Sequence, residues 1–498
     1  MRPLLVTARR SRSRIALTVV SVALPIALAA SCGDSGSATD TPSDDAAVDD
    51  SSNETLATDE SGADIVAPSE TTTDTAAAID TTPPPCSGPG ASPDPWSMLG
   101  HDGKRTSASN GCIHASLTES WRFDGKSAGE KYYALYNAVG DKDAVYVHAA
   151  ERAPTVARVD ASTGKQAWRY AGPADYDLGN WLTLGFDTVL VDDDGVYLLA
   201  AADGKLKTTS GVDWWGQTAA DDKRFYVVTT THGDGPGAFV GGWDLTKGLA
   251  WKANEQGSCD PALGDTNGAL AVDAGVVYFA PRYVVTPKAG GSADAGTLKY
   301  ASGLYAIDAA TGSTKWSVPL SPQSSISLGD GHVYLIEPGP SLVARKTSDG
   351  AIAWSAPLAT DAFKVGSQPP LLARGSVVIA AGDQVRSFDA ATGKPGWTAT
   401  IARASFTSNP GTSINFVSCP SAGEPAGSPL LTTLAAATAS NTLIVTGGDA
   451  IHVLSLDSGA EQGKVALANA WNPIVIGDQL YVIASGASGT QLVAYRSK

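Results

Sequence analysis

The stretch AIDAATGSTKW, residues 306–316, decides the fold because the chain repeats it. RVDASTGKQAW (158–168) and SFDAATGKPGW (387–397) place the same three residue types at the same spacing. These positions are Asp160, Gly164 and Trp168; Asp308, Gly312 and Trp316; and Asp389, Gly393 and Trp397. An Asp side chain can accept hydrogen bonds from backbone N–H groups ahead of it, and Gly adopts positive φ without strain. The repeat therefore predicts a tight turn between two strands.

Weaker copies of the repeat set its period. The positions that align with the Asp are residues 160, 203, 244, 308, 346, 389 and 457. Four of the six intervals are close to 40 residues, and the two longer ones, ending at 308 and 457, indicate a repeat with an insertion. A period of about 40 residues with several short strands in each unit is typical of a β-propeller.

Eight β-rich runs give the number of blades. We assign one to the second strand of each blade: 144–150, 195–201, 224–230, 276–282, 332–338, 376–382, 442–448 and 479–485. The last unit lacks a fourth strand, and the Trp-led segment ESWRFDG (119–125) has no partner before it. Pairing the two predicts an all-β, eight-bladed propeller over residues 119–498, closed by an N-terminal strand. Closure would remove the exposed edges that promote aggregation.

The N-terminal 32 residues have the pattern of an export signal. Five Arg residues precede the apolar stretch IALTVVSVALPIALAAS, which ends in small residues before Cys32. This end resembles the lipobox of bacterial lipoproteins, which implies lipidation of Cys32 and attachment to a membrane outside the cytoplasm. The alternative is an ordinary secretory signal that is cleaved near a Cys.

Residues 33–85 have the composition of a disordered tether. They contain 13 Asp and Glu residues and no Lys or Arg, with Ser, Thr, Ala and Pro between them. Such a segment cannot bury enough apolar surface to offset the entropy of ordering, and its carboxylates repel one another. An entry segment, 86–118, leads from it into the propeller. The net charge of the whole chain is −16 and no basic stripe is present, which argues against a nucleic-acid partner.

The cysteines predict disulfides rather than a metal or redox site. If Cys32 is lipidated, four remain, and an even number in an exported chain favours two bridges. We prefer Cys86–Cys112 with Cys259–Cys419 among the three connectivities, because the first two residues are close in sequence. No pair has CxxC spacing, the six His residues are scattered, and we predict no metal site.

The pattern A-x-D-x-x-T-G-x-x-x-W resembles the PQQ-like repeat, the tryptophan-docking motif of quinoprotein dehydrogenases. WSMLGHDGKRTSAS (96–109) resembles the W-x-M-x-G-x-D-x-x-x-T segment that enters such propellers. The resemblance implies that each Trp packs between neighbouring blades. It also covers BamB-like lipoproteins, which are non-catalytic scaffolds of outer-membrane protein assembly, so the name of the repeat does not establish a cofactor.

The two long intervals and one inner-strand register are the candidate binding features. Insertions at 253–268, 283–301 and 402–428 follow the ends of strands that a propeller places on one face, and long loops on one face often bind partners. Nine residues before the aromatic of the second strand lie Asn137, Gln217, Ser325 and Asn472. These would form a polar collar at the channel mouth, although channel mouths are polar without any ligand.

These observations favour a non-enzymatic function. We expect a binding scaffold at the cell envelope that captures an envelope protein or a small ligand on the loop-rich face, with no cofactor. One alternative is a PQQ-dependent dehydrogenase with PQQ and calcium in the ring centre. That class often has a disulfide between adjacent cysteines, which this chain lacks, and no calcium ligands can be assigned. The other alternative is a BamB-like factor for outer-membrane protein assembly.

Overall fold

The computed structural model describes most of the predicted propeller. The described residues are 94–124, 134–150, 154–172, 181–192, 196–209, 217–229, 239–253, 269–281, 303–358, 369–381, 383–401, 433–447, 449–486 and 489–497. All of them belong to one unit of the chain, residues 79–498. The predicted export signal, tether and lipidation site lie outside the described residues. No helix in the described ranges is long and apolar enough to cross a membrane.

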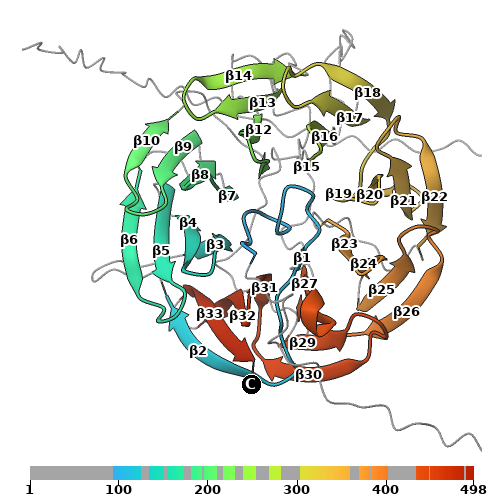
Figure 1. Ribbon diagram of the computed structural model, residues 1–498. Coiled ribbons are helices and arrows are strands. Elements are labelled where there is room, and N and C mark those ends of the chain that lie inside the picture. The colour runs from blue at the N-terminus through green and yellow to red at the C-terminus, as the bar shows by residue number, and fades with distance from the viewer. Residues whose placement is uncertain are drawn as a thin grey trace, which may run out of the picture. The chain divides into compact units, whose positions relative to one another are not determined.

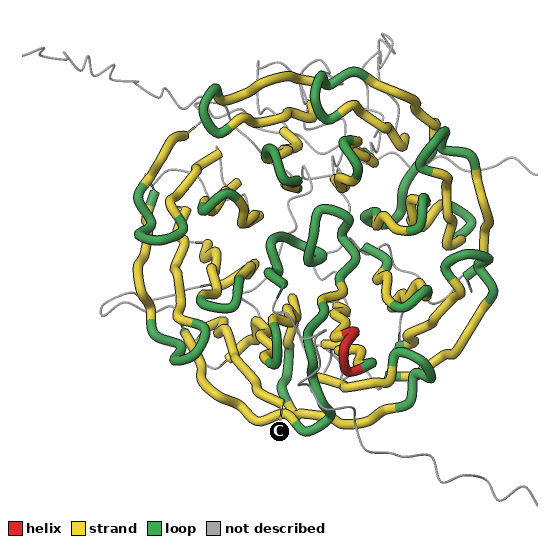
Figure 2. The backbone as a smooth tube through the Cα atoms, in the orientation of Figure 1, coloured by secondary structure: helices red, strands yellow, loops and turns green. Residues whose placement is uncertain are grey.

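Eight sheets stand around a common centre, which confirms the all-β, eight-bladed propeller (Figure 1). Each sheet contributes its first strand to the centre and its fourth to the rim, and every pairing within these four strands is antiparallel. Figure 2 shows how little of the described chain is helical. The single short 3-10 helix among the described residues is η3 (Thr438–Ser440).

The blades are numbered from the one that begins at residue 134. Blade 1 comprises β3 (Ala134–Gly140), β4 (Ala144–Ala150), β5 (Pro154–Asp160) and β6 (Gln166–Ala171), and blade 2 comprises β7 (Trp181–Gly185), β8 (Thr188–Asp192), β9 (Val196–Ala200) and β10 (Leu206–Thr209). Blade 3 comprises β11 (Thr218–Ala220), β12 (Phe225–Thr229), β13 (Phe239–Asp244) and β14 (Gly248–Ala253), and blade 4 comprises β15 (Ala269–Asp273), β16 (Val276–Ala280), β17 (Gly303–Asp308) and β18 (Thr314–Pro319).

The second half of the ring has the same plan. Blade 5 comprises β19 (Ser327–Gly329), β20 (His332–Glu337), β21 (Ser341–Lys346) and β22 (Ile352–Pro357), and blade 6 comprises β23 (Leu371–Ala373), β24 (Ser376–Ala381), β25 (Gln384–Asp389) and β26 (Pro395–Thr400). Blade 7 comprises β27 (Thr433–Ala437), β28 (Thr442–Gly447), β29 (Ala450–Ser455) and β30 (Glu461–Ala466), and blade 8 comprises β31 (Ala470–Ile476), β32 (Gln479–Gly486) and β33 (Gly489–Ser497). The fourth strand of blade 8 is β2 (Leu117–Phe123), antiparallel to β33.

Blade 2 differs from the sequence prediction. The run 195–201 contains β9, which is the third strand, and the second strand is the shorter run 188–192. The aligned Asp position is also wrong in two copies. Gly204 N donates to Ala200 O and Gly459 N donates to Ser455 O, so Ala200 and Ser455, rather than residues 203 and 457, hold the position. Neither residue has a carboxylate, so the sequence alignment placed the nearby Asp203 and Asp457 in this position instead.

The Asp of the repeat caps its own turn, as predicted. Asp160 Oδ1 accepts hydrogen bonds from the backbone N–H of Ser162 and Thr163, and from both hydroxyls. These bonds, with the hydroxyl of Ser162 first, lower the pKa of Asp160 to about 2. Asp308 and Asp389 accept equivalent bonds. The Gly of each turn has φ near +70°.

The Trp of the repeat joins each blade to the next. Its indole stacks on the turn Gly of the following blade, where an added Cβ would come within 3.0 Å of the ring. Its Nε1 donates to the carbonyl that follows the Asp position, at 2.8–3.0 Å. The six pairs are Trp121–Ala161, Trp168–Ala201, Trp251–Ala309, Trp316–Thr347, Trp354–Ala390 and Trp397–Leu456.

The joint between blades 7 and 8 has no Trp because the chain itself crosses there. Gly463 occupies the Trp position in β30, paired with Val453 two residues before Ser455. A Cβ on Gly463 would overlap the carbonyl of Ala115. Residues 113–117 thus fill the space of an indole as the chain passes from the ring centre to the rim.

The described part of the entry segment contacts all eight blades from inside the ring. We call residues 96–112 the belt (Figure 2, loop and turn segments in the centre). Its backbone bonds to seven blades through Gly140, Leu184, Val272, Leu328, Leu372, Ala436 and Gly477, at 2.6–2.9 Å. The remaining blade, blade 3, is reached by the Arg105 side chain, which donates to Thr218 O at 3.0 Å. Within the belt, β1 (Ala108–Ser109) pairs parallel to β27.

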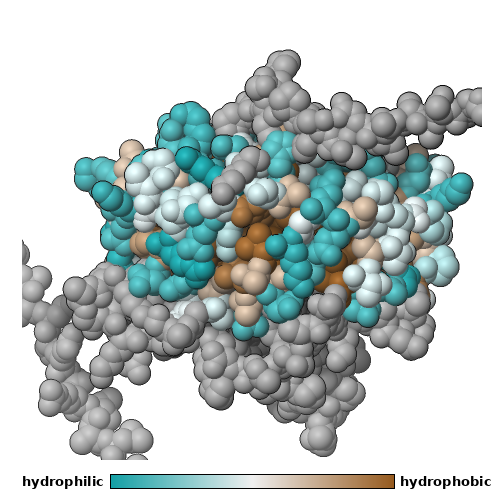
Figure 3. Space-filling view, turned by 90° about the horizontal axis from the view of Figure 1, so that it is seen from below, coloured by the Kyte–Doolittle hydropathy of each residue, from teal (hydrophilic) through white to brown (hydrophobic). Residues whose placement is uncertain are grey.

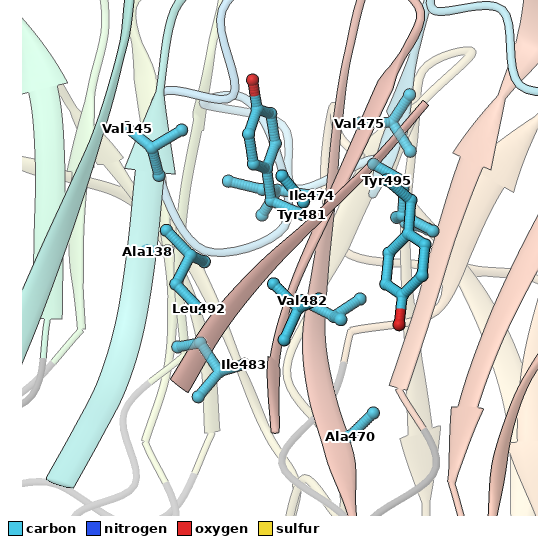
Figure 4. Packing of buried hydrophobic residues seen from close by; sticks show 14 of the residues in the cluster. Ala138, Val145, Ala470, Ile474, Val475, Tyr481, Val482, Ile483, Leu492 and Tyr495 are labelled. Atoms are coloured by element: carbon cyan, nitrogen blue, oxygen red, sulfur yellow. The ribbon is translucent and has the colours of Figure 1, made fainter. Parts of the chain in front are cut away.

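The largest apolar core lies where blades 7, 8 and 1 meet. Ile474, Tyr481, Val482 and Leu492 are at most 1% exposed there, and Figure 4 shows Ala138 of blade 1 among them. Burial of such side chains stabilises the fold by about 1.5–3 kcal/mol each. Seen edge-on, this part of the rim is mostly hydrophilic around an apolar area (Figure 3).

The belt contains a pH-sensitive contact. His101 is 5% exposed, with Nε2 at 3.2 Å from Asp94 and Nδ1 at 3.8 Å from Asp102. Burial lowers the pKa of His101, but its interactions with the two nearby carboxylates outweigh burial and raise the pKa from 6.5 to about 9.

We expect the belt to lose stability in alkaline solution. Because the folded pKa lies above the unfolded one, the contribution of His101 is complete below pH 6.5 and is lost as the pH rises through about 9. The free energy of unfolding should therefore fall more between pH 7 and pH 10 in the wild type than in His101→Gln. Parallel pH profiles of the two proteins would contradict this.

Candidate functional site

The strand order places all the long connections at one end of the ring. Connections from a fourth strand to the next first strand, and from a second to a third, leave the same end of an antiparallel blade. The insertion after β14, the insertion after β26 and the one between β16 and β17 are all of these kinds. The insertions themselves, with Cys259 and Cys419, lie outside the described residues. We call this end the loop face.

Two members of the predicted collar meet across blades 1 and 8. Asn472 Nδ2 donates to Asn137 Oδ1 at 3.2 Å, and Asn137 is 3% exposed. Each Asn lies at a register shift of its inner strand, and Asn472 has φ +51°. A bulge redirects a side chain, and Asn adopts the left-handed region more readily than most residues, which explains this residue type here.

The other two members form a second pair across blade 4. Gln217 Nε2 donates to Ser325 Oγ at 3.1 Å, and Gln217 Oε1 accepts from Leu270 N at 3.3 Å. Both side chains are buried, at 6% and 4% exposure. The structure thus brings the four predicted residues together as two separate pairs near the loop face, with their side-chain polar atoms bonded to one another.

Beneath the second pair lies a residue that the sequence analysis missed. Arg105 is fully buried, and its guanidinium donates to three backbone carbonyls: Leu99 O at 2.8 Å, Thr218 O at 3.0 Å, and Leu270 O. Burial lowers the pKa of Arg105 to about 9, opposed by the charge of Asp102. Thr218 follows Gln217, and the N–H of Leu270 binds the Gln217 side chain. Arg105 therefore supports the collar from below.

The entry motif, residues 96–109, holds the backbone at Arg105 in position. Asp102 Oδ1 accepts from Thr106 N at 3.0 Å, which closes a loop over residues 102–106. Gly100 has φ +75°, and an added Cβ would lie 3.1 Å from the Cβ of Arg105. The motif W-x-M-x-G-x-D-x-x-x-T is thus the framework of this loop. The signal available in the sequence was a charged residue between the Asp and the Thr of this motif.

The described lining of the ring centre does not fit calcium. Calcium binds six to eight oxygens and favours carboxylates. Here the amides and the hydroxyl bind one another in two pairs, and the carbonyls of Thr218 and Leu270 beside the second pair are bonded by the Arg105 guanidinium. In the described ranges, no group of three or more His, Cys, Asp or Glu is placed to hold a metal ion. No step of a calcium-dependent PQQ reaction follows from these residues.

Cys112 is the one cysteine in the described residues. It is 1% exposed, its N–H donates to Gly477 O at 2.7 Å, and its Sγ lies 3.9 Å from His114 Nε2. The partners that the sequence analysis preferred, Cys86 for this residue and Cys259 with Cys419, remain predictions.

Comparison with known proteins places this geometry in a class. Residues 301–496 match the family model described as outer membrane protein assembly factor BamB. No curated protein matches the chain in sequence. The chain is similar in structure to a europium-containing methanol dehydrogenase, with 13% identity and a TM-score of 0.61, covering 82% of this chain and 99% of that one.

Two further structures show the same fold. A quinohemoprotein alcohol dehydrogenase from Comamonas testosteroni has 13% identity and a TM-score of 0.57, covering 81% of each chain. BamB from Moraxella catarrhalis has 16% identity and a TM-score of 0.50, covering 77% of this chain and 98% of that one. The described domain therefore has the β-propeller fold of these structures. Its C-terminal part, by sequence, is similar to the BamB factor.

Proposed function

We propose that this chain is a non-catalytic scaffold of the cell envelope, whose propeller captures an envelope protein or a small ligand on the loop face. In this proposal the chain is exported, and a lipid on Cys32 attaches it to a membrane while the acidic segment 33–85 separates the domain from that membrane. The observation that supports it most is the ring centre. The four amide and hydroxyl side chains predicted at its mouth are bonded in pairs, so none of the four is placed as an acid, a base or an activated nucleophile.

The sequence match also supports a binding function. The matched model is that of an assembly factor, and the match covers β17 and β18 of blade 4, blades 5–7, and blade 8 from β31 to residue 496. A BamB-like contribution to outer-membrane protein assembly is the second candidate, which requires a cell with an outer membrane. The dehydrogenases share only the fold at 13% identity.

Photo-cross-linking tests the proposed binding face. Thr400 ends β26 at the loop face and is exposed, whereas Lys394 lies in the turn at the opposite end of that strand and is also exposed. With a photoreactive residue at position 400 of the full-length chain in its own envelope, we expect a discrete adduct. The same residue at position 394 is the matched control and should give little. Equal adducts at both positions would overturn the proposed face.

Reconstitution tests the enzymatic alternative separately. The purified chain is incubated with PQQ and Ca²⁺, then desalted, and both retained absorbance and dye-linked alcohol oxidation are measured. We expect neither. Retained chromophore at one equivalent, with activity that Gln217→Leu removes, would show that the ring centre is a cofactor site and that the scaffold proposal is wrong.

A further inference from the structure

Six of the eight joints hold the tryptophan, the crossing at Ala115 replaces it at the seventh, and in the described residues the eighth, between blades 2 and 3, has neither. In blade 2, Thr208 pairs with Leu198, two residues before Ala200, which is the register that Trp168 holds against Arg158 in blade 1. Thr208 therefore occupies the Trp position. The second-strand Tyr that packs on the Trp in five other blades is also missing, since Leu190 faces Leu198 in that register.

The turn on which the indole would pack is nevertheless present in blade 3. Asp244 caps the turn through Thr246 and Lys247, and Gly248 has φ +79°. At the six filled joints an added Cβ on the turn Gly would meet the indole of the preceding blade. At Gly248 the only atom within 4 Å is Trp243 Cζ2 at 3.9 Å, which belongs to the same blade. No indole of the preceding blade covers this Gly, and the buried Trp243 of blade 3 lies beside it.

The hydrogen-bond acceptor of the joint is open as well. At the filled joints the carbonyl after the Asp position accepts from an indole N–H. In blade 3 this residue is Leu245, and among the described residues no donor reaches its carbonyl. A Leu at this position does not itself exclude an indole, because Leu456 holds the same position in blade 7 and accepts from Trp397 at 2.8 Å.

The two joints without a Trp differ in what occupies the Trp position. Between blades 7 and 8 the backbone at Ala115 fills the space, whereas no described segment of the chain crosses between blades 2 and 3. The rim at blade 2 is also apolar. Leu206 of β10 is 45% exposed, one of two large apolar side chains in the described ranges with such exposure, and Leu245 and Leu249 are partly exposed beside the open turn.

We propose that the outer joint between blades 2 and 3 is a docking site for the tryptophan side chain of a partner polypeptide. Six joints of this same chain define the occupant: an indole whose face covers the turn Gly and whose N–H donates to the following carbonyl. The site continues the interface that the two blades already form, where Phe186 and Phe225 meet at 5.4 Å between ring centroids. It lies at the C-terminal turn of β13, away from the loop face, and is independent of the proposed function.

The test uses peptide-borne indole and a substitution that fills the site. Binding of Ac-Ala-Trp-Ala-amide to the purified full chain is followed by saturation-transfer NMR. We expect weak binding to the wild type and at least a roughly tenfold loss in Thr208→Trp, which restores the missing joint. The same peptide with 2-naphthylalanine, which lacks the N–H, should bind roughly fivefold more weakly, as expected for one lost hydrogen bond.

Two controls keep the result interpretable. Thr398→Trp adds an indole at an exposed threonine of β26, another outer strand, and should leave peptide binding unchanged. Thr208→Trp should also raise the thermal midpoint by about 1–3 °C, whereas Thr398→Trp should not. No binding to the wild type, undiminished binding to Thr208→Trp, or a lowered midpoint in that variant would overturn the proposal. Binding of free indole without binding of the peptide would overturn the assignment to a partner polypeptide.

Discussion

Gly312→Ala should destabilise the propeller by about 3–4 kcal/mol, and Gly275→Ala by only about 1 kcal/mol. Both glycines lie in blade 4 and have nearly the same backbone conformation, with φ +75° and +74°. A Cβ on Gly312 would lie 2.6 Å from the indole of Trp251, whereas no atom lies within 4 Å of a Cβ on Gly275. The pair therefore separates backbone strain from displacement of the joint.

Urea unfolding monitored by tryptophan fluorescence measures both variants. The difference between them should be about 2 kcal/mol or more, because overpacking a well-packed contact costs about 1–3 kcal/mol and the indole would also lose its hydrogen bond to Ala309. If both variants lose the same stability, positive φ alone explains the glycine, and the inter-blade contact is unimportant.

Arg105→Met should lower the free energy of unfolding by about 3–5 kcal/mol. The substitution keeps an unbranched side chain of similar length but removes every donor. The carbonyls of Leu99, Thr218 and Leu270 would then lose their shared cation in a site without solvent. Each buried acceptor left unsatisfied costs about 1–3 kcal/mol, and the belt would lose its contact with blade 3 and one of its contacts with blade 4.

The neighbouring residue supplies the matched control. Lys104 is 46% exposed and pairs with Asp273 at 3.2 Å, so Lys104→Met should cost less than about 1 kcal/mol. Arg105→Lys should fall between the two, because an ammonium keeps the charge but cannot reach three carbonyls in fixed directions. Equal midpoints for Arg105→Met and Lys104→Met would show that the guanidinium does not hold the ring.

Sequence reasoning succeeded where the determinants are local. The turn of Asp308 is built from bonds within six residues, so the Asp, Gly and Trp could be interpreted without a structure. It failed in blades 2 and 7, where Ala200 and Ser455 hold the Asp position without a carboxylate. Blade 2 also misled the strand assignment. Because three short apolar runs follow one another there, the pattern alone did not show which was the second strand.

The candidate site was predictable only in part. Counting back from the second-strand aromatic selected four polar residues near the loop face, but these lie in two separate pairs rather than in one collar. It did not show that Asn137 binds Asn472 and that Gln217 binds Ser325, because those partners come from different blades. Nor could spacing reveal Arg105, whose three acceptors lie in the belt itself and in two blades more than 100 residues away.

The sequence by itself determined the repeated joint, the number of blades and the register that places polar residues at one end of the channel. Those features depend on turns and strand periods, which act over a few residues. Only the tertiary structure decided that residues 96–112 line the ring centre, that the crossing at Ala115 replaces one tryptophan, and that the joint at Thr208 stays open. Each depends on which distant segments ring closure brings into contact, and no local pattern records that.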